Sequence, residues 1–283
     1  MSIGQSAFYE CNSLESIVLP EGITSIDHHV FYDCHSLISV TIPDSVTSIG
    51  DHAFCDCENL TSITIPDSVI SIGGSAFQGC RSLTSIIIPD GVTSIEDNTF
   101  DYCRSLISIT IPDSVTSIGR NAFLHCENLT NITIPEGVTS IDSGAFWNCS
   151  SLTSITIPNG VTSIEYDTFN NCDNLTSIII PEGVTSIGGM AFYDCDNLTS
   201  IAIPNGVVSI GNEAFAWSEN LTSITIPDSV TSIGKEAFDM CSKLSSLSFE
   251  GTMAQWNAIS KGEEWNHYVP ATYVQCSDGQ VTL

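Results

Sequence analysis

Positively charged residues are scarce in this sequence. The chain has 283 residues with 6 Lys and Arg against 33 Asp and Glu, which gives a formal net charge of −27. Proteins that bind nucleic acid or anionic lipid present clustered Lys and Arg to phosphates and headgroups. The composition therefore predicts no nucleic-acid partner and no adsorption to anionic membranes, whereas it favours cationic partners and cations.

Long apolar segments are absent as well. No run of about 18 apolar residues, the length that a transmembrane helix needs, occurs in the chain, so we predict no membrane insertion. The first residues have neither the basic nor the apolar region of a secretory signal peptide. Residues 2–8 match residues 48–54, which places the start of the chain inside a repeat. We therefore expect a piece of a longer protein that lacks its N-terminal cap.

Motifs of known catalytic chemistry are also missing. The sequence contains no Gly-x-Ser-x-Gly elbow, no His-Glu-x-x-His zinc motif, no phosphate-binding loop and no EF-hand. A single active site needs one unusual constellation of residues, whereas the serines and threonines here recur in every repeat. We predict that the protein is not an enzyme and that it has no catalytic residues, no cofactor site and no metal site.

What the chain does contain is a repeat of 23 residues. The leucines from Leu14 to Leu244 and the phenylalanines from Phe8 to Phe238 keep this step without an insertion. A fixed period of this length is typical of a solenoid, in which each unit contacts only its neighbours. Ten prolines mark the same step: Pro20, Pro43, Pro66, Pro89, Pro112, Pro135, Pro158, Pro181, Pro204 and Pro227.

One repeat, residues 60–82, shows how a turn of the solenoid should be built. The β-branched stretch 60–65 favours a short strand, which Pro66 ends because proline has no N–H to donate. A second short extended segment follows at 69–72. Ala76, Phe77 and Cys80 have the spacing of one apolar side of a helical turn. We predict a repeat solenoid of the α/β class with about 11 turns, parallel short strands and one short helical turn per repeat.

The twelve cysteines are spaced by the repeat and not in pairs. Ten of them occupy one column, in which Ser218 takes one place, and no Cys-x-x-Cys occurs. We interpret the column as a ladder of small, buried, reduced side chains, with disulfides or a metal site as the alternatives. The column consists of Cys11, Cys34, Cys57, Cys80, Cys103, Cys126, Cys149, Cys172, Cys195 and Cys241.

The repeat pattern Cys-x-x-Leu-x-x-Ile-x-Ile-Pro-x-x-Val-x-x-Ile-Gly-x-x-Ala-Phe-x-x-Cys resembles the BspA-like leucine-rich repeats. The resemblance covers residues 2–249, and the tail from Phe249 resembles the segment that often follows such repeats. We therefore divide the chain into a leucine-rich repeat solenoid, 1–249, and a C-terminal capping segment, 250–283. The resemblance implies a bacterial or protist protein that acts in adhesion, with an extracellular or cell-surface location for the parent protein.

The C-terminal segment has its own signals. Thr252 is a suitable N-cap for a helix in which Met253, Trp256 and Ile259 lie near one face. The sequence 272–283 predicts a hairpin with an Asp-Gly turn. Together these elements predict a small cap over the last repeat.

Three repeated surface features have a functional and a structural interpretation. Outward Ser and Thr columns could bind carbohydrate, protein or ice, or they could reflect β-propensity on a solvated face. The acidic residue that follows most of the prolines could form a stripe for a basic partner or divalent cations, or it could serve the turn. His29, His52 and Asp51 could hold zinc, or the histidines could simply be solvated.

The columns that vary between repeats are the ones able to carry specificity. The most variable columns flank the Phe of each repeat, and their Tyr and Trp residues are of the type that anchors interfaces. We predict a candidate interaction surface formed by Trp147, Tyr166, Tyr193 and Trp217. The leading hypothesis is a non-enzymatic scaffold that binds a protein ligand, such as a host or matrix protein. A carbohydrate-binding array and a structural spacer of a longer surface protein are the alternatives.

Overall fold

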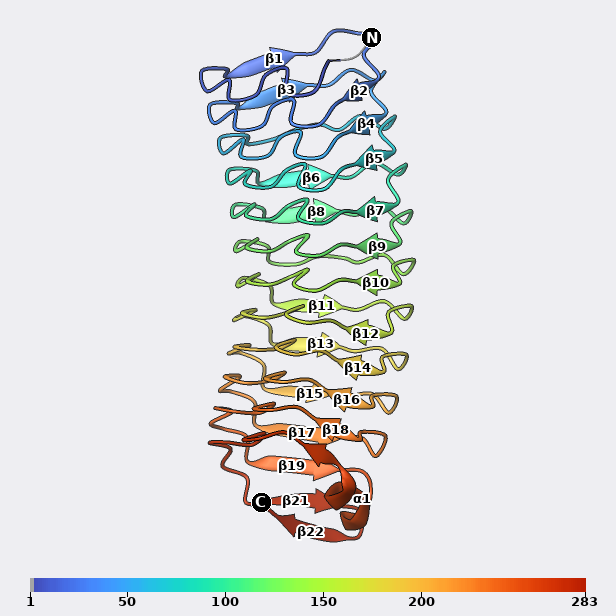
Figure 1. Ribbon diagram of the computed structural model, residues 1–283, viewed down its shortest axis with the longest axis vertical. Coiled ribbons are helices and arrows are strands. Elements are labelled where there is room, and N and C mark those ends of the chain that lie inside the picture. The colour runs from blue at the N-terminus through green and yellow to red at the C-terminus, as the bar shows by residue number, and fades with distance from the viewer. Residues whose placement is uncertain (1–2) are drawn as a thin grey trace. The chain divides into compact units, whose positions relative to one another are not determined.

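The computed structural model describes residues 3–283, so Ser2, the first residue of the expected partial repeat, lies outside it. The chain forms two compact units, Met1–Ser140 and Ile141–Leu283. Within each unit the coils lie one above the next, and the short strands of successive coils lie side by side in two lines (Figure 1).

The strands of the first line follow the Leu of each repeat. They pair in parallel with a register of one repeat, as in Ser16↔Ser39 and Ser154↔Ser177, which confirms the parallel arrangement. The first unit contains β1 (Ser16–Val18), β3 (Ser39–Thr41), β6 (Ser85–Ile87) and β8 (Ser108–Thr110). The second unit contains β11 (Ser154–Thr156), β13 (Ser177–Ile179), β15 (Ser200–Ala202), β17 (Ser223–Ile226) and β19 (Ser246–Phe249).

The strands of the second line follow the proline turn and are two residues long. Each of them except β20 ends on a buried Ile. The first unit contains β2 (Ser25–Ile26), β4 (Ser48–Ile49), β5 (Ser71–Ile72), β7 (Ser94–Ile95) and β9 (Ser117–Ile118), and β10 (Ser140–Ile141) spans the boundary. The second unit contains β12 (Ser163–Ile164), β14 (Ser186–Ile187), β16 (Ser209–Ile210), β18 (Ser232–Ile233) and β20 (Ser260–Lys261).

The stretch 60–65 differs from the prediction, because it is extended but belongs to no sheet. The Thr61 N–H lies 3.4 Å from the Ile38 carbonyl, and the Thr84 N–H lies 3.4 Å from the Thr61 carbonyl, both longer than a normal ladder bond. Ile63 and Ile65 are nevertheless buried. The alternation of side chains was therefore predicted correctly even where the hydrogen-bonded ladder is incomplete.

The helical turn that we predicted in each repeat is wrong: the segment around Phe77 is a series of tight turns. The Gln78 and Cys80 amides bond three residues back, whereas the Phe77 amide donates to the next coil, at the carbonyl of Thr99. Left-handed residues, Ser75 (φ 55°) and Gly79 (φ 71°), interrupt the segment. A helix needs every amide to bond four residues back along its own axis, but here alternate amides join neighbouring coils. Similar turn segments recur in the other repeats.

The core consists of side-chain ladders that run from coil to coil within each unit. Phe54, Phe77 and Phe100 stack nearly parallel, with ring centroids 5.4 and 5.7 Å apart, and their side chains are fully buried. The same stacking joins Phe169, Phe192 and other phenylalanines of the second unit. Identical side chains one coil apart thus fill the interior, which explains why the Phe column does not vary.

The cysteine column is reduced, and its thiols also act as hydrogen-bond donors. The Cys103 thiol donates to the carbonyl of Phe77 in the preceding coil at 3.2 Å. The Ser218 hydroxyl makes the equivalent bond to Phe192 at 2.8 Å, which explains why serine can replace cysteine there. Burial raises the pKa of Cys34 to about 11 and that of Cys241 to about 12, so these thiols stay protonated and unreactive at neutral pH.

The C-terminal segment has the predicted local structure. Thr252 caps α1 (Met253–Ala258) through a capping box with Gln255. β21 (Tyr273–Cys276) adds to β19 in parallel and forms an antiparallel hairpin with β22 (Gly279–Thr282). Trp256 is buried, and Trp265 packs edge-on against Phe238, the last member of the Phe ladder. Aromatic side chains therefore cover the final repeat.

Candidate functional site

The variable columns lie on the turn segments, and the backbone there explains part of their composition. The second residue before each Phe and the second residue after it adopt left-handed φ values in successive repeats. Asn, Asp and Gly suit this conformation, and they occupy many of these positions. Tyr102 (φ 59°) and Trp217 (φ 64°) are bulky exceptions. Because a large side chain at such a position costs free energy, these two residues deserve a functional explanation more than their neighbours do.

The four predicted surface residues all lie on turn segments of the second unit. Tyr166 and Trp217 are exposed, at 49% and 41%, whereas Trp147 and Tyr193 are half-buried. The Tyr166 hydroxyl lies 3.1 Å from the Met190 sulfur in the next coil. The structure thus places the four side chains along neighbouring coils of one unit, with two of them available to a partner.

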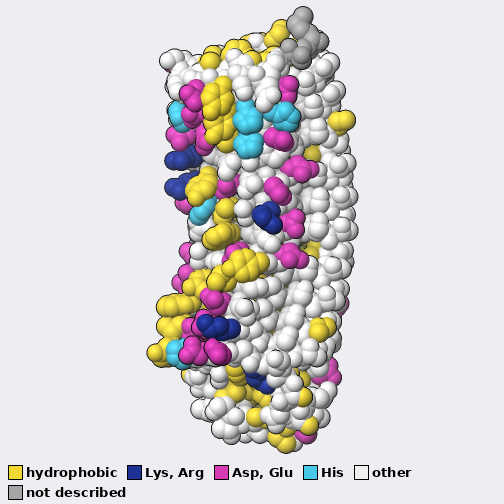
Figure 2. Space-filling view, viewed as in Figure 1, with side chains coloured by type: hydrophobic (Ala, Val, Ile, Leu, Met, Phe, Trp, Pro, Cys, Tyr) yellow, Lys and Arg dark blue, Asp and Glu magenta, His cyan; other side chains and the backbone are white. Residues whose placement is uncertain are grey.

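Within each unit, the face shown in Figure 2 concentrates chemical variety on one side. Hydrophobic side chains there lie among acidic, cationic and histidine side chains, while most of the other side is neutral. This distribution fits the division between the variable turn segments and the uniform strands.

The threonine column just before the second line of strands is less free than the sequence suggested. The Thr47 hydroxyl donates to the Thr24 carbonyl at 3.1 Å, and the Thr185 hydroxyl donates to the Thr162 carbonyl at 3.2 Å. In the separate outward Thr column of the first line of strands, the substitute for a missing Thr is usually β-branched as well, as in the exposed Val18, Ile87 and Ile179. A position that retains branching but not the hydroxyl is selected for strand geometry. These observations favour the β-propensity interpretation.

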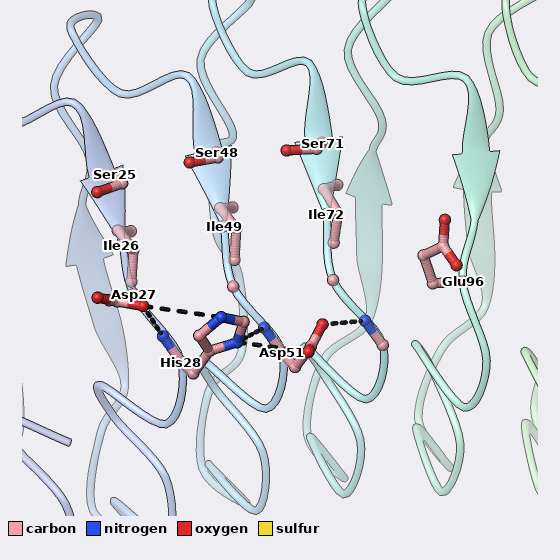
Figure 3. Close-up of a pocket in the computed structure, with 13 residues that line it drawn as sticks. Ser25, Ile26, Asp27, His28, Ser48, Ile49, Asp51, Ser71, Ile72 and Glu96 are labelled. Atoms are coloured by element: carbon pink, nitrogen blue, oxygen red, sulfur yellow. Dashed lines mark hydrogen bonds and ion pairs between the residues drawn. The ribbon is translucent and has the colours of Figure 1, made fainter. Parts of the chain in front are cut away.

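A pocket of about 410 Å³ lies beside the second line of strands in the first unit. Two of its acidic side chains, Asp27 and Asp51, accept hydrogen bonds from backbone N–H groups (Figure 3). The Asp51 carboxylate accepts the Gly74 N–H at 3.0 Å, and His28 Nδ1 accepts the Asp51 N–H at 3.0 Å. The carboxylate of Asp97 and the amide oxygen of Asn212 bind the next coil in the same way. The column that contains His28, Asp51, Asp97 and Asn212 therefore accepts backbone hydrogen bonds from the next coil and caps its turns.

The two histidines that could have held zinc do not converge on one point. His29 and His52 stack with ring centroids 4.8 Å apart and an interplanar angle of 3°. The nitrogen lone pairs of parallel rings point in parallel directions, and the Asp51 carboxylate faces His28 instead. Across residues 3–283, no three His, Cys, Asp or Glu side chains are arranged to hold a metal ion. The zinc interpretation is therefore wrong for these residues.

A second pocket in the first unit was not predicted. It has a volume of about 340 Å³, and Tyr32 and Tyr102 are among the residues that line it. Between these tyrosines the neighbouring coils carry the small residues Cys55 and Gly79 in the same two columns. The sequence does contain a pattern that indicates this pocket, namely small residues between aromatic ones. The pattern can be recognised only when residues 23 positions apart are known to lie one above the other. We call this site the tyrosine pocket.

A polar network underlies the tyrosine pocket. The Gln78 amide donates to Asp101 Oδ2 at 2.9 Å, and the Cys55 thiol lies 3.5 Å from the Asp56 carboxylate. Asp101 is 4% exposed, and its Oδ1 has no partner among residues 3–283. Burial raises the pKa of Asp101 to about 6, although the hydrogen bond from Gln78 offsets part of that rise.

Known proteins share both the repeat and the fold. The BspA type leucine-rich repeat region matches residues 1–123, 47–176 and 162–260. A leucine-rich cell surface protein from Faecalibacterium prausnitzii is 35% identical, with a TM-score of 0.55 over 92% of this chain and 85% of that one. A leucine-rich repeat protein from Bacteroides ovatus is 25% identical, with a TM-score of 0.63 over 97% and 87%.

Two further comparisons complete this description. The pneumococcal vaccine antigen PcpA is 19% identical with a TM-score of 0.56 over 88% of this chain and 79% of that one, and it shares the fold. A comparison with curated proteins finds no significant match. Among residues 3–283, no helix has the length and apolar character needed to cross a bilayer. The 23-residue repeat, the parallel short strands and the matched regions together show that the chain belongs to the BspA type leucine-rich repeat family.

Proposed function

We propose that this chain is a non-enzymatic scaffold that binds a protein ligand at a cell surface, in adhesion to a host or neighbouring cell. Leucine-rich repeat families are generally non-catalytic and commonly bind proteins. The related protein from Faecalibacterium prausnitzii is described as a cell surface protein, which supports an extracellular or surface location for the parent protein. The proposed ligand is a host or matrix protein.

The observation that carries this proposal is a set of four aromatic side chains on the turn segments of the second unit, two of them exposed. We define it as the unit 2 aromatic surface: Trp147, Tyr166, Tyr193 and Trp217. Trp217 is 41% exposed and occupies a left-handed position where Asn171 stands two repeats earlier. Large rigid aromatic side chains supply much of the binding energy of protein interfaces. A scaffold whose inward columns are uniform would present its specificity at variable turn positions such as these.

The test is binding of the purified chain to immobilised, purified matrix proteins by surface plasmon resonance. The variant combines Trp147→Asn, Tyr166→Ser, Tyr193→Asn and Trp217→Asn, because other repeats carry these residues in the same columns, so the fold should tolerate them. We expect a loss of binding of about 30-fold or more, since removing interface anchors costs about 2 kcal/mol or more.

The matched control changes three exposed residues of the strand face, Val18→Thr, Ile87→Thr and Ile179→Thr. It should bind like the wild type, because those positions carry Thr in other repeats. Enzymatic removal of glycans from the immobilised proteins separates recognition of protein from recognition of sugar. Binding to none of the matrix proteins, or equal binding by the four-residue variant, would contradict the proposal.

A further inference from the structure

The tyrosine pocket of the first unit exists because large and small side chains alternate along stacked columns. Tyr9 stacks on Tyr32 with centroids 5.1 Å apart, and the next coil has the small Cys55 in the same column, with His52 tilted against the Tyr32 ring at 6.4 Å. Tyr102 packs against His125 of the following coil, while the preceding coil has Gly79 in that column. Tyr32 and Tyr102 are three coils apart, which at about 4.8 Å per coil separates them by about 14 Å.

The space between the tyrosines is kept open by the backbone. Gly79 has a left-handed φ of 71°, and a Cβ at this residue would collide with the Asp56 carboxylate. Any side chain at this position would therefore both displace Asp56 and fill the pocket. The volume of about 340 Å³ lies at the lower end of the range for small-ligand sites, roughly 300–1,000 Å³.

The charges around the pocket limit what can enter it. The chain has only 6 Lys and Arg residues, yet Arg81 lines the pocket and Arg104 lies 5.4 Å from the centre of the Tyr102 ring. These guanidinium groups, which also pair with Glu58 at 3.5 Å and with Glu127 at 3.4 Å, disfavour a cationic occupant. Asp56 lines the same pocket and Asp101 lies beneath it, so an anionic occupant is disfavoured as well. A neutral ligand that can both donate and accept hydrogen bonds remains.

The lining offers such a ligand polar groups of both kinds. The Asp56 carboxylate accepts hydrogen bonds, the Arg81 guanidinium donates them, and the Gln78 amide can do both. His52 also lines the pocket, although its Nδ1 is buried away from the open space. The two tyrosine rings add apolar faces at opposite ends of the space. Rings next to such a mixture of polar groups suit a ligand with an apolar face and many hydroxyl groups.

We propose that the tyrosine pocket binds a neutral pyranose residue of a glycan. The C–H face of the sugar packs on Tyr32 or Tyr102, and its hydroxyl groups bond to Asp56, Gln78 and Arg81. This site is distinct from the unit 2 aromatic surface in position and in ligand class, so either proposal can fail without the other. The Ser and Thr columns of the strands have no part in it.

The experiment measures binding of the intact chain to an array of neutral and acidic oligosaccharides, followed by titration with the neutral glycan that binds best. Tyr32→Asn and Tyr102→Asn test the two walls. Asn170 and Asn171 occupy these same columns in another repeat, and Asn tolerates the left-handed φ of position 102, so both variants should fold. We expect each variant to bind about tenfold more weakly, because one lost ring contact is worth up to about that factor.

A filling variant and a control sharpen the result. Cys55→Tyr continues the Tyr9–Tyr32 stack into the pocket and should abolish glycan binding. Tyr268→Asn, like Tyr102→Asn, removes a tyrosine from a left-handed position, but it lies in the C-terminal segment and should leave glycan binding unchanged. The proposal is overturned if no neutral glycan binds the wild type, if only acidic glycans bind, or if Tyr102→Asn and Cys55→Tyr bind as the wild type does.

Discussion

The Phe column and the column immediately after it show what repetition and variation each contribute. In the Phe column every coil carries the same ring, and within each unit the rings stack at 5.2–5.7 Å with no exposure beyond the first coil. The next column carries Tyr32, Cys55, Gln78 and Asp101 in four successive coils, and there the structure has a pocket and a buried carboxylate with an unpaired oxygen. Identical side chains in neighbouring coils pack into a continuous core, whereas side chains of different size in neighbouring coils leave space for a site.

The largest expected effect comes from breaking the Phe ladder. Phe77→Ala should destabilise the chain by about 3–5 kcal/mol, because it removes a fully buried ring from between two stacked neighbours. Urea denaturation followed by circular dichroism measures the change. Thr110→Ala is the control, since Ala202 occupies the same outward column, and it should change stability by less than about 0.5 kcal/mol. Equal effects from the two variants would refute the division between core and surface columns.

The second effect concerns the buried acid in the variable column. Asp101→Asn should stabilise the chain by about 2 kcal/mol at pH 7.5 and have little effect below pH 4. The folded state raises the pKa of Asp101 to about 6, above the unfolded value of 3.8, so the folded state binds the proton more tightly. This group therefore stabilises the fold at low pH, and that stability is lost as the pH rises through 6.

Stability curves from pH 4 to pH 8 test this prediction, with Asp44→Asn as the control for removing one exposed carboxylate. Asn170, in the same column of the second unit, shows that the fold accepts an amide there. A destabilised Asp101→Asn protein at pH 7.5 would mean that the carboxylate has a favourable partner in the folded state.

The repeat made most of the fold predictable, because every inward position is repeated in every copy. The columns of Leu, Ile, Phe and Cys predicted the core, and Thr252 and the Asp-Gly turn predicted the helix and the hairpin of the C-terminal segment. The helical turn was predicted wrongly because the spacing of Ala76, Phe77 and Cys80 does not reveal that alternate amides bond to the next coil. Burial of these three residues was predicted correctly, but the backbone between them was not.

The candidate site was less predictable, because it depends on neighbours 23 residues apart. Tyr166 and Trp217 could be chosen as large aromatic residues, and the structure shows that they are exposed. The tyrosine pocket depends instead on what lies between Tyr32 and Tyr102, and on the close approach of the Asp56 carboxylate to Gly79. The sequence alone contains the residue types but not these distances.

A third, smaller effect tests why the cysteine column tolerates serine. Cys103→Ser should change stability by less than about 1 kcal/mol, because the hydroxyl can donate to the Phe77 carbonyl as Ser218 donates to that of Phe192. Cys103→Ala should cost about 1–2 kcal/mol, since it removes the donor and leaves a small cavity. Urea denaturation of both variants decides between them. If Ala proves as stable as Ser, the column needs only a small side chain, and the thiol hydrogen bond contributes nothing measurable.

The smallest expected effect lies in the stacked histidine pair, where two variable positions happen to be identical. Burial, and then the neighbouring His29, lower the pKa of His52 below its usual 6.5, while the nearby Asp51 acts in the opposite direction. Because the folded state disfavours the charged ring, the stability that depends on neutral His52 is present above pH 6.5 and is lost as the pH falls below it. The variant His52→Ser copies Ser75, which stands in the same column with the same left-handed backbone. Between pH 7 and pH 5 we expect this variant to lose less stability than the wild type, with a difference of less than about 1 kcal/mol. His35→Ser, at a half-buried histidine outside the pair that contacts the Asp33 carboxylate at 2.7 Å, is the control for removing one imidazole. If His52→Ser loses as much stability as the wild type between pH 7 and pH 5, the stacked pair has no part in the response to acid. Stacking of identical histidines in neighbouring coils would then make no measurable contribution to stability.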